Sequence, residues 1–333
     1  MPKHNLLRRL GVAGFIAPFI ALPFVLGGYQ LNTLLLLLIF IIVAVSFRLM
    51  ATTGEFSLAH VVIMGIGGYT SALLARHFGL SFWVTLPLGG LAAAGFAAIT
   101  AYPLFRMKGV YFFVGSFAIG EAVRLSWIQW RVPFGGTNGL WFIPAPTASL
   151  PGLGTIAFNT VFSYYFLTLG ITAVCLFVMY RIEKSRVGKT LRAIHSQDSL
   201  CESLGINILG YKTLAYISAS FFAGISGVLL AHYMGSVTPY EFSLTTMLYC
   251  IVWVIVGGTN TFWGPIAGVL ALGWLEEGLR GTLAAWMPMV YGFCLIGVLF
   301  ALPDGLESLP QRITEWRRAR RDRRGQLKEI VSG

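Results

Sequence analysis

The sequence predicts an all-α, polytopic membrane protein with both ends in the cytoplasm. Of its 333 residues, 56% are hydrophobic and 11% are charged, whereas about 25% of the residues in a soluble domain are charged. Long apolar segments recur along the chain, and Lys and Arg are concentrated in alternate connections between them. Because basic residues avoid translocated loops, this pattern indicates a multi-pass topology.

Ten segments approach the roughly 20 apolar residues that a helix needs to cross a bilayer core. The third is rich in glycine and carries His60, so it either crosses fully or is re-entrant. The first begins like a secretory signal, but a second apolar segment follows at once, which predicts an uncleaved first span. The candidate spans are 11–28, 31–48, 57–75, 82–104, 109–128, 159–180, 211–233, 244–261, 264–281 and 284–302.

With the N-terminus inside and the spans alternating, about twenty of the 24 Lys and Arg residues lie inside. A miscounted span in mid-chain would move a large basic block outside. Residues 1–306 are predicted to form one transmembrane domain, with a loop on the outer side of the membrane at 129–158, and a charged cytoplasmic segment at 181–210. Residues 307–333 form a basic cytoplasmic tail, for which anionic lipid is the expected partner rather than nucleic acid.

The cytoplasmic segment contains Gly188-Lys189-Thr190, which matches the end of a phosphate-binding loop, GxxxxGK[ST]. Glu183 stands where that loop needs its first glycine, and no strand precedes it, so the backbone amides that cradle phosphate are not expected here. We therefore predict no ATP site on this chain. No cofactor and no metal are expected on it either. The chain is not expected to be an enzyme, and an ATPase that drives it would be a separate protein.

Residues 188–205 are predicted to form one short amphipathic helix. Leu191, Ile194, Cys201 and Leu204 can share an apolar stripe, and Gly205 is a suitable C-terminal stop. Such a helix outside the spans favours docking to lipid headgroups or to a protein. A solvated linker is the alternative.

Few ionisable residues lie inside the predicted spans, where each is costly. Glu121 and Arg124 are three residues apart and can form a local pair, so Glu121 is a candidate for lining or gating a pathway. Glycines cluster in several spans. They predict close helix packing, with broken helices that line a cavity as the alternative.

Several blocks, taken in order, resemble one known family. They are Gly54-Glu55-Phe56-Ser57-Leu58 with Gly65-Ile66-Gly67-Gly68-Tyr69; Gly109-Val110-Tyr111-Phe112-Phe113 with Gly120-Glu121; Gly135-Gly136-Thr137-Asn138-Gly139-Leu140; Ser185, Gly188, Arg192-Ala193-Ile194, Leu204-Gly205-Ile206 and Lys212; Ala223-Gly224 with Gly227; Gly257-Gly258 with Gly264-Pro265 and Gly268; and Pro303 with Gly305-Leu306. Over about 34–306 the chain resembles the permease subunits of branched-chain amino acid ABC importers, the Liv type. That family also includes urea and amide importers.

The sequence departs from the family pattern at a few positions. His195-Ser196-Gln197 stands where the family usually has Arg-Glu/Asp-Asn, and Ala59 and Asn260 replace glycines. The docking surface and the substrate are therefore where divergence is expected.

The resemblance implies a complex in the bacterial inner membrane. It contains a second permease subunit, expected to be a paralogue, two cytoplasmic ATPases that hold ATP and Mg²⁺, and a periplasmic substrate-binding protein. Branched-chain or related amino acids are the implied cargo; a urea or amide permease, or an ion-coupled secondary transporter, is the alternative. The segment 188–205 is implied to be the coupling helix that contacts the ATPase. The implied coupling residues are Gly188, Arg192, Ala193, Ile194, Gln197, Glu202 and Gly205, and the pathway or gate candidates are Ser57, Gly65, Gly67, Tyr69, Glu121 and Asn138.

Overall fold

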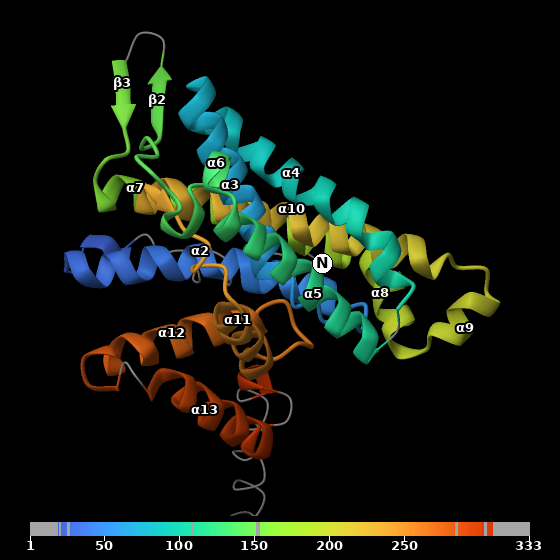
Figure 1. Cartoon of the computed structure of the whole chain (residues 1–333). Coiled ribbons are helices and arrows are strands. Elements are labelled where there is room, and N and C mark those ends of the chain that lie inside the picture. Colours follow the sequence, from blue (N-terminus) through green and yellow to red (C-terminus); the bar gives the residue numbers. More distant parts are fainter. Residues whose placement is uncertain are drawn as a thin grey trace, which may run out of the picture. The chain divides into compact units, whose positions relative to one another are not determined.

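The computed structural model describes residues 19, 21–24, 27–107, 109–150, 154–283, 286–302 and 305–308. The predicted first span and the basic tail lie largely outside these residues. The chain divides into two compact units, Met1–Met247 and Leu248–Gly333. Figure 1 labels their α-helices and the strands β2 and β3.

The first unit contains most of the helices. Its elements are η1 (Leu22–Phe24), α2 (Gly28–Ala51), α3 (His60–Phe78), α4 (Phe82–Phe105), α5 (Val110–Gln129), α6 (Arg131–Phe134), η2 (Gly136–Asn138), β1 (Leu140–Trp141), β2 (Thr147–Leu150), β3 (Gly154–Ala157), α7 (Val161–Lys184), α8 (Arg186–Ser196), α9 (Asp198–Ser203), α10 (Ile208–Met234) and β4 (Ser236–Val237). Helix α11 (Leu244–Gly257) begins at its end. The second unit continues with α12 (Gly264–Leu283), α13 (Met287–Ala301) and η4 (Leu306–Ser308).

Five helices of the described chain are long and apolar enough to cross a membrane: α2, α3, α4, α7 and α10. Two further apolar helices, α11 and α13, are shorter, and α5 matches another predicted span in position. Large apolar side chains on α4 and α7 are exposed, among them Ile99, Val174 and Phe177. Because a water-soluble protein rarely exposes such surface, these helices fit a multi-pass membrane protein. The total of ten spans and their orientation stay predictions.

Helix α3 begins at His60, three residues later than the predicted span, and continues without a break to Phe78. Residues 52–54 form a turn, 55–57 have no regular structure, and 58–59 form a second turn that leads into the helix. The His60 side chain is buried at the start of the helix, where its Nε2 lies 2.8 Å from the Ser46 hydroxyl of α2. The glycine-rich region is therefore one helix, and its glycines must serve a purpose other than breaking it.

Those glycines allow α3 and α10 to pack backbone to backbone. A Cβ atom built on Gly67 would lie 2.3 Å from the carbonyl oxygen of Gly224, and one on Gly227 would lie 1.9 Å from the carbonyl oxygen of Met64. No side chain fits at such distances, so the close-packing interpretation is confirmed here. Since Gly67 meets Gly224 and Ser71 meets His232, the two helices run in the same direction.

The all-α prediction needs one correction, because the described chain contains two small antiparallel sheets. Strands β2 and β3 pair along their whole length, with Thr147 opposite Ala157 at one end and Leu150 opposite Gly154 at the other. They form the hairpin labelled in Figure 1. Strand β1 pairs with β4, with Leu140 opposite Val237. This second pairing joins the 129–158 segment to the connector that follows α10, two segments far apart in the sequence.

Candidate functional site

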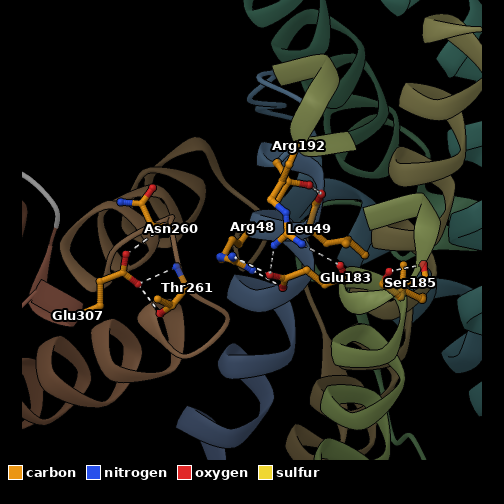
Figure 2. A network of polar contacts seen from close by, with 10 residues as sticks. Arg48, Leu49, Glu183, Ser185, Arg192, Asn260, Thr261 and Glu307 are labelled. Carbon is orange, nitrogen blue, oxygen red and sulfur yellow. Dashed lines mark hydrogen bonds and ion pairs between the residues drawn. The ribbon is translucent and has the colours of Figure 1, made fainter. Parts of the chain in front are cut away.

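A buried carboxylate joins the predicted coupling segment to two long helices. Glu183, near the C-terminal end of α7, accepts hydrogen bonds from Arg48 of α2 at 2.6 and 3.2 Å and from Arg192 of α8 at 3.2 Å. Arg48 and Glu183 are almost completely buried, with 2% and 4% of their side chains exposed, whereas 41% of Arg192 is exposed. Figure 2 shows both guanidinium groups directed at the one carboxylate. We call these three residues the Glu183 cluster.

Helix α8 turns back closely onto the end of α7. Ser185 has an extended backbone between the two helices, and its N–H and hydroxyl groups both donate to the carbonyl of Ile182. A Cβ atom on Gly188 would lie 2.1 Å from the carbonyl oxygen of Glu183, so only glycine permits this approach. The contact brings Arg192, one turn further along α8, within reach of Glu183.

A second ion cluster holds the following helix. The ammonium group of Lys212, near the start of α10, lies 3.1 Å from Glu55 and 3.3 Å from Asp198. Glu55 belongs to the connection before α3, and Asp198 is the first residue of α9. Lys212 and Glu55 are mostly buried, so their mutual attraction is screened less than that of an exposed pair. We call these residues the Lys212 cluster.

The predicted single helix 188–205 is in fact two helices. Gln197 has φ −154° and ψ 94°, which is extended backbone, and it separates α8 from α9. Leu191, Ile194 and Cys201 are buried as predicted, but Leu204 is 72% exposed. The break changes the direction of the chain, so a stripe extrapolated along one straight helix fails at its far end.

Gly205 does end the second helix, as predicted. Its φ is +77°, its N–H donates to Glu202, and the N–H of Ile206 donates to Cys201. This pair of bonds is the Schellman pattern, which satisfies the last carbonyl groups of a helix.

The phosphate-loop resemblance has no counterpart in the local backbone. Gly188, Lys189 and Thr190 lie inside α8, and the Thr190 hydroxyl donates to the carbonyl of Arg186 within that helix. Glu183, the residue that interrupts the motif, is instead the centre of the Glu183 cluster.

The structure brings two of the pathway candidates together and separates the others. Gly65 and Tyr69 lie on one face of α3, and Trp127 of α5 and Phe242 of the connector after β4 pack against that face. A Cβ atom on Gly65 would lie 2.7 Å from both of those rings. The Tyr69 ring stacks on the Trp127 ring with centroids 4.5 Å apart. Gly67 instead packs against Gly224.

The remaining pathway candidates lie elsewhere. Ser57 is fully buried in the connection before α3, and its hydroxyl accepts from the N–H of Ala59. Glu121 forms the predicted pair with Arg124, whose Nε lies 2.9 Å from Oε2. Asn138 is exposed, and its backbone carbonyl accepts from the indole of Trp141.

In the second unit, a carboxylate closes the turn between α11 and α12. Glu307 accepts from the N–H groups of Asn260 and Thr261 at 3.0 and 2.9 Å, as Figure 2 also shows. Gly257 and Gly268 let α11 and α12 approach closely, since a Cβ on Gly268 would lie 1.9 Å from the carbonyl oxygen of Trp253. The family-like glycines of this unit therefore serve packing.

Sequence reasoning missed both ion clusters. Arg48 contributed only to the charge count, Lys212 only to that count and to the family resemblance, and Glu183 was noted only for interrupting a motif. One signal was available: Arg48 and Glu183 lie in the last turns of two apolar helices that end on the same predicted side. Opposite charges so placed are candidates for a pair, because a buried charge needs a partner.

Long apolar helices packed through glycines, with a short helical segment attached to their ends by ion pairs and by the close contact at Gly188, fit a multi-pass membrane subunit. The chain belongs to the family described as the permease component of the branched-chain amino acid transport system, which it matches over residues 29–299.

Named relatives agree with this assignment. The chain is 26% identical over 318 residues to the high-affinity branched-chain amino acid transport system permease protein LivM of Escherichia coli K12, covering 90% of this chain and 75% of that protein. It is 26% identical over 178 residues to LivH of Salmonella typhimurium, covering 52% and 54%. It is also 22% identical over 224 residues to the nucleoside ABC transporter permease protein NupC of Lactococcus lactis, covering 63% and 67%. No solved structure gives a significant match.

Proposed function

We propose that this chain is one of two permease subunits of a binding-protein-dependent ABC importer, and that α8 and α9 receive the motion of a separate cytoplasmic ATPase. The observation that carries this proposal is the attachment of α8–α9. The Glu183 cluster fastens α8 to α2 and α7, and the Lys212 cluster fastens α9 to α10. A force applied to this short segment would reach three long helices without passing through a flexible linker.

The exposed side of α8–α9 supplies the proposed ATPase contact. Ala193, Gln197 and Glu202 are exposed and are the residues proposed to touch the partner. Gly188 and Ile194 are buried within this chain, so their proposed role is to hold α8 in place.

The proposed topology has ten spans, with both ends in the cytoplasm of a bacterium and the 129–158 segment in the periplasm. The basic tail at 307–333 would lie against anionic lipid of the inner membrane. The second permease is proposed to be a paralogue, because LivM and LivH, both named as permeases of branched-chain amino acid transport, are similar to this chain.

The proposed mechanism begins when ATP closes the dimer of ATPase subunits. The coupling helices move with them, and the packed helices switch between inward-facing and outward-facing arrangements. A periplasmic binding protein delivers the solute, so the permease itself needs only weak contacts along the path. ATP and Mg²⁺ would be held by the ATPases, and this chain would carry no catalytic step.

Branched-chain or related amino acids are the proposed cargo, supported by the names of the family and of LivM. Urea or a short amide is the alternative within the same family. Purifying the co-encoded binding protein and identifying the solute that it retains would decide between them.

Crosslinking tests the coupling assignment. The four native cysteines are first replaced by serine or alanine in a complex that still transports, since Cys201 lies in α9. Gln197→Cys is expected to crosslink to the co-expressed ATPase, whereas Trp141→Cys, exposed on the predicted periplasmic side, serves as the matched negative control. A transporting complex that gives no crosslink at Gln197, Ala193 or Glu202 would overturn the assignment.

A further inference from the structure

Three aromatic rings surround Tyr69 on one face of α3. Tyr69 stacks on Trp127 with centroids 4.5 Å apart, meets Phe134 of α6 edge to face at 5.8 Å, and lies 6.4 Å from Phe242. Tyr69 and Phe242 are each 1% exposed, and Trp127 is 4% exposed. We call these four residues the aromatic cluster.

Phe242 reaches this cluster from a non-helical connector. Helix α10 ends at Met234, and residues 236–243 then return along α3: Val237 lies against Gly68, and Phe242 lies against Gly65. Backbone without helical hydrogen bonds is tolerated among membrane helices where it is buried in protein or lines a polar cavity. The connector therefore places polar groups beside α3.

Two polar atoms at the aromatic cluster are buried without a hydrogen-bond partner among the described residues. They are the hydroxyl oxygen of Tyr69 and Oε2 of Glu241. The other carboxylate oxygen of Glu241 accepts from the Thr238 hydroxyl at 3.2 Å, and the charge of Glu241 acts on the Tyr69 side chain. Buried polar groups are nearly always paired, so two neighbouring unpaired ones need an explanation.

The chemistry of these groups suits a small organic cation. A carboxylate supplies negative charge, a phenol oxygen can accept a hydrogen bond, and aromatic faces attract cations. An ammonium group has three N–H donors, enough for both unpaired oxygens. An anion would be repelled by Glu241, and an apolar group would leave both oxygens unpaired. One oxygen of the Glu241 carboxylate already accepts from the Thr238 hydroxyl, and an arriving ammonium group would give the other oxygen a partner and favour the ionised form.

We propose that Glu241 and Tyr69 form the transient site that receives the α-ammonium group of the transported amino acid. This inference rests on the proposed function, because it assumes that amino acids pass this face of α3. It adds Glu241, Tyr69 and the aromatic cluster as determinants of which solutes pass.

The test uses the complete complex, with the second permease, the ATPases and the binding protein, in proteoliposomes. Uptake of radiolabelled leucine, isoleucine and valine is measured together with ATP hydrolysis. Glu241→Gln is expected to lower uptake at least tenfold, and Tyr69→Phe, which keeps the ring, several-fold. Tyr164→Phe is the matched control: that buried hydroxyl donates to the carbonyl of Leu229 at 2.8 Å, away from the cluster, and its loss should leave uptake within twofold of the parent. Glu241→Asp should restore part of the loss.

The outcomes separate the two proposals. If the parent complex takes up none of the three amino acids in a binding-protein-dependent way, the proposed function is wrong and this inference falls with it. If the parent transports and Glu241→Gln transports equally well, the inference alone is overturned. Should Glu241→Gln fail to assemble, Tyr69→Phe decides: unchanged uptake overturns the proposal, and a several-fold loss against an unaffected Tyr164→Phe supports it.

Discussion

The two arginines of the Glu183 cluster should differ sharply in what they contribute to stability, although both bind the same carboxylate. Arg48 and Glu183 are 2% and 4% exposed. Removing one partner of such a buried pair typically costs about 3–5 kcal/mol, because the remaining charge is left uncompensated. Arg192 is 41% exposed, and exposed pairs contribute about 0.2–1 kcal/mol.

Arg48→Gln is therefore expected to lower the free energy of unfolding by about 3 kcal/mol more than Arg192→Gln, which is roughly a hundredfold in the unfolding equilibrium. Reversible unfolding of the purified chain in mixed micelles, followed by circular dichroism, measures both variants. The doubly apolar variant Arg48→Met with Glu183→Leu should lose less than Arg48→Gln, since no buried ion is left without a partner.

Equal losses for Arg48→Gln and Arg192→Gln would refute the reasoning, because burial would then not decide the strength of the two contacts. A loss below about 1 kcal/mol for Arg48→Gln would also refute it, since a pair as weak as an exposed one would be indicated.

Three further predictions concern single side chains. Gly188→Ala should prevent α8 from docking on α7 and abolish stable assembly, judged by size-exclusion chromatography, whereas Gly170→Ala in α7 has open space around its Cβ and should be neutral or slightly stabilising; a normally assembled Gly188→Ala protein would contradict the close approach. Lys212→Gln should leave Glu55 without its partner and make α9 more accessible to protease, and unchanged cleavage would count against the Lys212 cluster. Glu307→Ala should cost about 1 kcal/mol, because the two backbone N–H groups that it binds in the turn after α11 are exposed and can be hydrated once freed, and unfolding curves that overlay the parent would exclude that role.

Apolar length could be read from the sequence with good accuracy. The predicted span 82–104 corresponds to α4 (Phe82–Phe105) and 109–128 to α5 (Val110–Gln129), because a run of apolar residues ends where the helix leaves its apolar surroundings. Gly205 could also be predicted as a helix stop, since a left-handed C-terminal residue is a local requirement.

Contacts between distant residues could not be predicted in the same way. Arg48 and Glu183 are 135 positions apart, and nothing in the local pattern around either residue specifies the other. Leu204 illustrates a second limit: the helical stripe was extrapolated across Gln197, whose extended backbone redirects the chain. The aromatic cluster was not predicted: Tyr69 was named only as a pathway candidate on a recognisable helix face, whereas Phe242, like Glu241, belongs to a connector that carries no periodic signal.

Because the backbone breaks at Gln197, the proposed coupling segment consists of two helices, each attached to a different long helix. A segment attached to one helix could act only on that helix, whereas this segment is attached through α8 to α7 and through α9 to α10 and can act on both. A partner that tilts α8 against α9 would therefore twist these two helices relative to each other rather than shift them together. The glycine-lined contact between α10 and α3 suits such a rotation, because few interlocking side chains there would have to change their packing.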